Sequence, residues 1–191
     1  MDSINLTNKQ FAIIGARGSG KSVLATYILK QNPRMLLYDT LDEYGARGIR
    51  RYVPEDIYSI AELNEFIMEK AINLQPSMFV IEEANRYVLP HPTRLPPAVQ
   101  DLVDIGRHRG ISLGLIGRRP TQFHSDFFEL VDYAFIFSAN GKNDYKYLEE
   151  LHEGLGDMVR SLPKYHFAVL DRSQGQALIY VHAPVPLMYR E

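Results

Sequence analysis

Short apolar runs alternate along the chain with longer segments in which apolar residues recur at helical spacing. Such a run is typical of a strand buried on both faces, as in a parallel sheet. We predict these strands at residues 11–15, 35–39, 78–82, 111–117 and 133–137, with a shorter one at 49–53. The helical spacing predicts helices at residues 21–30, 59–72, 97–108, 126–130, 144–151 and 156–162. Ser125 is expected to cap the helix at 126–130.

The order of these elements predicts an α/β fold with helices packed on both faces of a mainly parallel sheet. Two further strand-like runs, at 166–170 and 177–182, predict a C-terminal β-hairpin. A length of 191 residues fits one domain, so we expect residues 1–191 to form a single unit. Ligands of such sheets bind where the parallel strands end, which directs attention to the strand ends.

Charge and composition exclude several classes of site. The net charge is -2, so any contact with nucleic acid has to come from a local basic patch or from assembly. The chain contains no cysteine, which excludes disulfides and thiolate metal sites. No apolar segment approaches the roughly 20 residues that span a bilayer, and the first ten residues lack the apolar core of a signal peptide. We therefore expect a cytoplasmic protein without a membrane segment.

The first strand end carries a phosphate-binding motif. Gly15–Ser22 reads Gly-Ala-Arg-Gly-Ser-Gly-Lys-Ser, which fits the Walker A pattern, and it lies between a predicted strand and a predicted helix as the motif requires. Glycines let the backbone approach phosphate, and the amides at a helix start favour a bound anion. Lys21 should reach the β- and γ-phosphates of ATP, and Ser22 should be a ligand of Mg²⁺. The predicted nucleotide-binding residues are Gly15, Ala16, Arg17, Gly18, Ser19, Gly20, Lys21, Ser22 and Val23.

An acidic pair, Glu82-Glu83, ends the strand at 78–82. A Walker B site needs one carboxylate near the metal, and a hydrolase needs a group that deprotonates the attacking water. We predict that Glu82 serves the metal and Glu83 the water, although aspartate is commoner on the metal side. The alternative is two solvated acids at the start of a loop. Asp39, Asp42 and Glu43 follow another strand, where lining the nucleotide site, lining a subunit interface and forming a polar loop all remain open.

Arginines flank the strand at 111–117. Arg107 and Arg109 precede it, and Arg118 and Arg119 follow it. A positive charge near the γ-phosphate stabilises the charge that develops during phosphoryl transfer, and in a ring it can come from the neighbouring subunit. The alternative is a solvated basic rim. Our catalytic candidates are Glu83, Lys21, Arg107, Arg109 and Arg118.

These motifs together resemble the FtsK–HerA superfamily of DNA-pumping ATPases. Within it, the chain is most similar to the short genome-packaging ATPases of tailless viruses with an internal membrane. The likeness rests on the Walker A motif, the acidic pair, the segment Gly-Arg-His-Arg-Gly-Ile at 106–111 and Arg119-Pro120, and it extends from about residue 11 to residue 137. One departure is Arg118, which stands where the family usually has a sensor glutamine, so that Arg118 itself becomes a candidate for contacting phosphate.

The resemblance implies ATP hydrolysis coupled to the translocation of double-stranded DNA by a ring of five or six subunits. For a viral packaging enzyme it implies packaging into a preformed capsid, a capsid or vertex protein as partner, and a place in the host cytoplasm or the virion. It also implies that Arg107 is a candidate finger acting on the ATP of the neighbouring subunit, with Arg109 as the second choice.

Four other functions remain open from the sequence. Two are related motors: a HerA-type ATPase that works with a nuclease, and a plasmid or phage assembly ATPase of the zonular-occludens-toxin type. A third is a P-loop small-molecule kinase, in which the four arginines would form a lid over the phosphates. The fourth is a nucleotide-dependent switch with little turnover.

Overall fold

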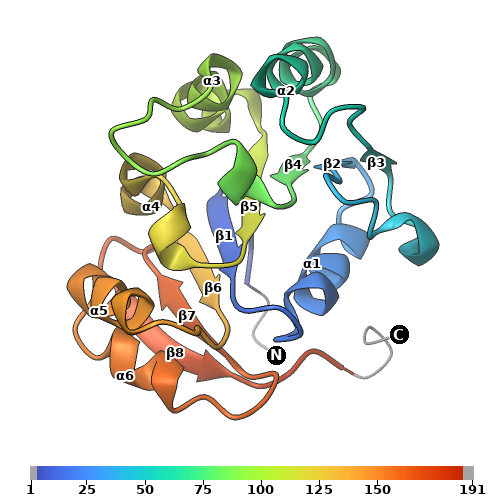
Figure 1. The fold of residues 1–191 in the computed structure, drawn as a ribbon. Coiled ribbons are helices and arrows are strands. Elements are labelled where there is room, and N and C mark those ends of the chain that lie inside the picture. The colour runs from blue at the N-terminus through green and yellow to red at the C-terminus, as the bar shows by residue number, and fades with distance from the viewer. Residues whose placement is uncertain (1–3, 187–191) are drawn as a thin grey trace.

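The structure is a computed structural model that describes residues 4–186. All the strands that it defines belong to one sheet (Figure 1). Its strand order is β3-β2-β4-β5-β1-β6-β7-β8. The strands from β3 to β6 in that order are parallel, whereas β7 and β8 form an antiparallel hairpin, so the predicted architecture is confirmed. The bounds are β1 Gln10–Ile14, β2 Met35–Tyr38, β3 Arg51–Tyr52, β4 Met78–Ile81, β5 Ser112–Gly117, β6 Tyr133–Ile136, β7 Phe167–Asp171 and β8 Leu178–His182. Residues 1–3, where the polar N-terminal segment begins, and residues 187–191 lie outside the described part.

The helices lie where the spacing predicts them, and α1 has the predicted bounds, whereas α4 and α5 are longer than predicted and the others end earlier. They are α1 Lys21–Lys30, α2 Ile60–Phe66, α3 Pro97–Ile105, α4 Ser125–Leu130, α5 Lys142–Leu151 and α6 Leu155–Arg160. The helix predicted at 59–72 divides into α2 and a π-helical segment at Ile67–Ile72, and the one predicted at 97–108 ends in a 3-10 turn at Arg107–Arg109. None of the described helices is long and apolar enough to cross a membrane.

The predicted cap of α4 is wrong by one residue. The N-cap is His124, whose Nδ1 accepts the amide N–H of Asp126 at 3.3 Å, while its Nε2 lies 2.7 Å from the carbonyl oxygen of Thr93. Ser125 is instead the first residue of the helix. A buried imidazole that has a partner on both nitrogens fixes the chain direction here, and no local sequence signal distinguishes it from a serine cap.

The helices cover the two faces of the sheet unequally (Figure 1). The helices α2 to α6 all pack on one face, where side chains such as Ile14, Phe79 and Ile136 form the larger core. Of the helices that the structure describes, α1 alone packs on the other face. There the remaining cover comes from the N-terminal segment at Leu6, the loop after β2 and the C-terminal segment at Val185. This irregular cover brings the C-terminal part of the chain next to the start of α1.

The parallel strands β1, β2, β4, β5 and β6 all end on one side of the sheet and begin on the opposite side. We call the side where they end the carboxyl edge and the side where they begin the amino edge. Backbone hydrogen bonds join the loops at the carboxyl edge. The amide of Gly15 donates to the Gly117 oxygen at 3.3 Å, and the amide of Ala16 donates to the Ser138 oxygen at 2.9 Å. The phosphate-loop motif, the acidic pair and Arg118 are therefore held at one edge.

Candidate nucleotide-binding and hydrolysis site

The predicted phosphate loop connects β1 to α1, as the motif requires. Gly20 has φ 113°, a conformation that residues with a side chain rarely adopt, and it precedes the first turn of the helix. A Cβ atom at Gly15 would lie 2.5 Å from Cβ of Phe137, so only glycine allows this close approach of β1 and β6. The loop therefore leads directly into the start of α1, where the helix terminus favours a bound anion.

Lys21 lies against this loop and close to the acidic pair. Its Nζ donates to the carbonyl oxygen of Ala16 at 3.1 Å. Burial lowers the pKa of Lys21, an effect that the carboxylates of Glu83 and Glu82 oppose and the charge of Arg118 reinforces. These charges thus lie within electrostatic reach of one another. Arg17, in contrast, is exposed on the loop.

Glu82 is buried at the end of β4, with 5% of its surface exposed. Its Oε2 has no hydrogen-bond partner among the described residues. Burial, together with the neighbouring acids Glu83, Glu43 and Asp39, raises the pKa of Glu82 to about 8, against the opposing effect of Lys21. A divalent cation beside this buried carboxyl group would favour its charged form, which is the behaviour expected of a metal-side acid.

The donor set fits Mg²⁺ bound together with a nucleotide. Mg²⁺ prefers oxygen ligands, retains several waters and usually takes only one or two carboxylates beside the substrate phosphates. Glu82 and the Ser22 hydroxyl would hold it, and the bound ion would neutralise phosphate charge. Within residues 4–186 no cluster of three or more His, Asp or Glu side chains forms a protein-only metal site, so the phosphates would have to complete the coordination.

Glu83, the predicted water-activating acid, is paired with Arg118. The Arg118 Nε donates to Oε1 of Glu83 at 2.7 Å, and this bond raises the pKa of Arg118. Glu83 has φ 47°, in the left-handed region, so the chain turns sharply directly after Glu82. The two carboxylates have different surroundings, since Glu83 is bound by Arg118 and Glu82 Oε2 has no partner among the described residues, which matches a division of roles between them.

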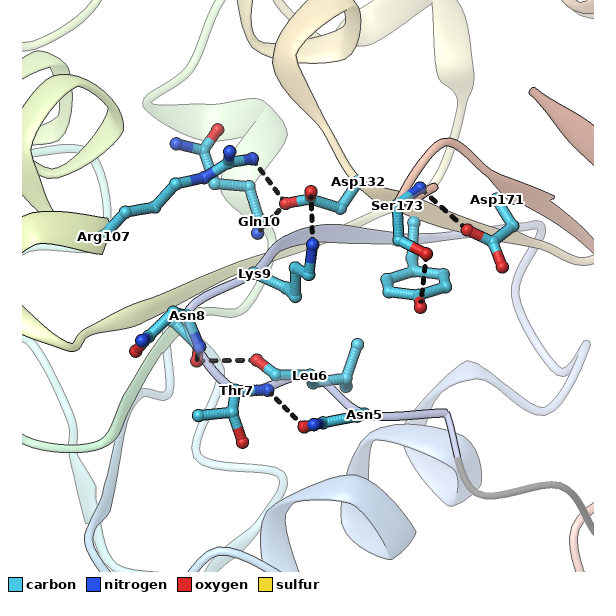
Figure 2. Close-up of polar contacts among 12 residues, drawn as sticks. Asn5, Leu6, Thr7, Asn8, Lys9, Gln10, Arg107, Asp132, Asp171 and Ser173 are labelled. Atoms are coloured by element: carbon cyan, nitrogen blue, oxygen red, sulfur yellow. Dashed lines mark hydrogen bonds and ion pairs between the residues drawn. The ribbon is translucent and has the colours of Figure 1, made fainter. Parts of the chain in front are cut away.

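Arg107 lies at the amino edge, where it meets Asp132 beside the start of β1 (Figure 2). Its Nη2 donates to Oδ2 of Asp132 at 2.6 Å, and the same carboxylate accepts from Lys9 Nζ at 3.2 Å and from the Gln10 amide at 2.8 Å. Because β1 begins at Gln10 and its five residues span about 15 Å, Arg107 does not reach the nucleotide site of its own subunit. Arg109 is exposed in the same turn.

Two further charged candidates, Arg119 and Asp39, have structural partners. Arg119 donates to both oxygens of Asp144, at 3.2 and 3.0 Å, and thereby joins the end of β5 to this buried residue in the first turn of α5. Asp39 is fully buried and accepts the amides of Glu43 and Tyr44 at 3.0 and 2.9 Å, so it shapes the loop after β2. For Asp39 the geometry favours loop formation over a place in the nucleotide site.

Four residues that line a cavity beside the phosphate loop belong to no sequence motif, so the motifs did not predict them. A cavity of about 300 Å³ opens beside the phosphate loop at Gly20, Lys21 and Ser22. Its other wall is Phe137 at the end of β6, Tyr165 before β7, and Pro184 and Val185 in the C-terminal segment. An aromatic and apolar wall beside a phosphate loop suits the base of a nucleotide. Only Phe137 had a signal in the sequence, since it is the last residue of the strand predicted at 133–137.

Comparison with known proteins finds one likeness in sequence and two in fold. It is 27% identical over 121 residues to the probable DNA double-strand break repair helicase HerA of Methanocaldococcus jannaschii, a match covering 58% of this chain and 23% of that protein. The genome packaging NTPase B204 of Sulfolobus turreted icosahedral virus 2, solved with ATP-gammaS, aligns with a TM-score of 0.80 at 18% identity over 96% of this chain and 100% of that one. VirB4 of Thermoanaerobacter pseudethanolicus aligns with a TM-score of 0.61 at 12% identity, over 95% and 91% of the two chains. No protein-family model matches.

The resemblance to the FtsK–HerA superfamily is confirmed. The structural likeness establishes the fold of a P-loop NTPase, in agreement with the predicted fold class. The chain spans about a quarter of the length of the curated relatives that it matches, 23% and 25%. What those longer proteins do as a whole is therefore a matter for proposal.

Proposed function

We propose that this chain is an ATP-hydrolysing motor that translocates double-stranded DNA, with residues 1–191 forming a single P-loop ATPase domain. The observation that carries the ATPase part is the meeting of Lys21, Glu82 and Glu83 at the carboxyl edge beside an open cavity. A nucleotide-binding protein without turnover needs a phosphate loop, but it does not need a second acid poised beside the metal-side acid.

In this proposal each side chain has one task. Lys21 and the loop amides bind the β- and γ-phosphates and stabilise the charge that develops on them. Ser22 and Glu82 hold Mg²⁺. Glu83 accepts the proton of the attacking water. Phe137 and Tyr165 contact the base, since they line the far side of the cavity.

The load is proposed to be a viral genome entering a preformed capsid. Support comes from the genome packaging NTPase B204, which this chain matches over the full length of that protein. We further propose a ring of five or six subunits, in which Arg107 or Arg109 reaches the nucleotide of the neighbour, because Arg107 lies at the edge opposite its own phosphate loop. A capsid or vertex protein would be the docking partner. A HerA-type motor is the second candidate, favoured by the sequence relative.

The arrangement of the arginines weakens the kinase alternative. A kinase lid would bring several arginines over the phosphates. Here Arg107 pairs with Asp132 at the amino edge, and Arg119 pairs with the buried Asp144. Only Arg118 lies beside the acidic pair, and one arginine does not form such a lid.

Double-stranded DNA is expected to raise the ATPase rate of the wild-type protein several-fold. The measurement is phosphate release with and without linear duplex DNA at low salt, because contacts to the DNA backbone weaken steeply as salt rises. Sedimentation of the same sample gives the assembled mass. A rate that duplex DNA leaves unchanged, together with transfer of the γ-phosphate to a nucleoside or nucleotide, would overturn the motor in favour of a kinase.

Tyr165→Ala is expected to weaken ATP binding about tenfold while leaving the binding of inorganic tripolyphosphate unchanged. Stacking of a base on an aromatic ring is worth roughly 1–3 kcal/mol, and the phosphate loop is untouched by the change. Isothermal titration calorimetry with both ligands measures the two affinities. The matched control is Tyr58→Ala, which removes a tyrosine that is 70% exposed and does not line the cavity. Equal weakening for both ligands would refute the base contact.

A further inference from the structure

The pair formed by Arg118 and Glu83 joins the ends of two neighbouring strands. The parallel strands β4 and β5 pair with Ile81 opposite Leu115, so the residues that follow them meet at the carboxyl edge. Arg118 Nε donates to Glu83 Oε1 at 2.7 Å. The Glu83 side chain is nearly buried, 9% exposed, whereas that of Arg118 is 48% exposed. The acid is thus fixed in place, and the guanidinium retains room to move.

This pair engages the acid that hydrolysis needs. A carboxylate accepts a proton from water only through an oxygen lone pair directed at that water. In Glu83, Oε1 is already bound by a charged donor, in a short and strong bond. One of the two carboxylate oxygens of Glu83 is therefore occupied by a protein partner.

Arg118 also lies where a second partner would arrive. Its charge acts on Lys21, the residue placed to bind the β- and γ-phosphates. A guanidinium carries five N–H donors in a rigid fork that matches phosphate oxygens, and within residues 4–186 Arg118 makes its side-chain hydrogen bond only to Glu83. A γ-phosphate beside Lys21 would compete with Glu83 for this fork.

We propose that Arg118 is a latch that holds Glu83 until a γ-phosphate binds and draws the guanidinium away. This rests on the proposed ATPase function and adds its regulation. Once Glu83 is released, the water oxygen bonds to the γ-phosphorus as the bond to the β,γ-bridging oxygen breaks. The water proton passes to Glu83, and ADP and phosphate leave. With ADP alone the guanidinium stays on Glu83, so the latch distinguishes ATP from ADP.

The test is equilibrium binding of ATP-gammaS and ADP, each with Mg²⁺, to four proteins: wild type, Arg118→Gln, Glu83→Gln and the double variant. We expect Arg118→Gln to weaken the binding of ATP-gammaS roughly 10-fold to 100-fold and to change the affinity for ADP less than about twofold. The reason is that only the γ-phosphate binds the guanidinium fork. Glu83→Gln keeps the shape of the acid but removes its charge. It should tighten the binding of ATP-gammaS about threefold to tenfold, because it weakens the bond that holds Arg118 on residue 83.

The decisive measurement is the affinity of the double variant for ATP-gammaS. In the absence of Arg118, Glu83→Gln should no longer tighten the binding of ATP-gammaS. Tightening that persists without Arg118 reflects only the loss of a negative charge near the phosphates, and it would overturn the latch. Equal effects of Arg118→Gln on ATP-gammaS and ADP would overturn it as well. Arg118→Lys, which keeps the charge without the fork, should fall between wild type and Arg118→Gln and guards against a folding artefact.

Two controls separate this proposal from the proposed function. Arg50→Gln removes the same charge from an exposed arginine next to β3, the outermost strand of the sheet. It should leave the affinities for ATP-gammaS and ADP unchanged. A wild-type protein that binds neither nucleotide would refute the proposed ATPase itself. A wild-type protein that binds both, with no coupling between Glu83 and Arg118, would refute only the latch.

Discussion

Lys21→Ala is expected to reduce the affinity for ATP by at least a hundredfold while leaving the fold intact. The lysine supplies an ammonium group beside the start of α1, 3.1 Å from the Ala16 oxygen. Loss of a charge-assisted contact to a phosphate costs about 1.5–3 kcal/mol, and Lys21 is placed to contact two phosphates. Calorimetric titration with ATP and Mg²⁺ measures the loss, and thermal unfolding without nucleotide checks the fold.

The thermal midpoint of Lys21→Ala should stay close to that of wild type, because burial of the ammonium opposes its charged form and no ion pair to Lys21 is lost within the described residues. Lys30→Ala is the matched control, since it removes an exposed lysine from the last turn of the same helix. Its ATP affinity should equal that of wild type. Retention of wild-type ATP affinity by Lys21→Ala would contradict the assigned role of the phosphate loop.

The local parts of the site could be predicted because their signals are contiguous. The phosphate loop needs a strand, several glycines and a helix start close together, and all three are visible in the sequence between residues 10 and 21. Glu82-Glu83 was found in the same way, as the polar end of an apolar run. Parallel pairing then brings these strand ends together without further information, since parallel strands share an edge.

The pairings between distant residues could not be predicted. Nothing near Arg107 in the sequence indicates that it binds Asp132, which lies 25 positions later beside a different strand. The same holds for Tyr165 and Val185, which reach the cavity because the C-terminal segment covers a face that only α1 packs against. Arg118 was a candidate for contacting phosphate, but its bond to Glu83 depends on β4 and β5 being neighbours. Strand order is a tertiary property that a pattern of apolar runs does not contain.

Glu83→Gln is expected to lower the rate of ATP turnover about a hundredfold to ten-thousandfold, which is the usual contribution of a general base. The amide has nearly the same shape as the carboxylate but does not accept the water proton. Binding of ATP should survive, because Lys21 and the phosphate loop are unchanged. The measurements are steady-state phosphate release and a single-turnover assay with ATP, which separates the chemical step from product release.

Glu43→Gln is the matched control for this change. Glu43 is an exposed acid whose charge also acts on Lys21, but it follows β2 and not β4. Its neutralisation should change turnover less than threefold if the loss in Glu83→Gln arises from proton transfer and not from the local field. Comparable losses in both variants would identify an electrostatic effect. A nearly wild-type rate in Glu83→Gln would remove the observation that separates a motor from a nucleotide-dependent switch, because the second acid at the carboxyl edge would then have no part in hydrolysis.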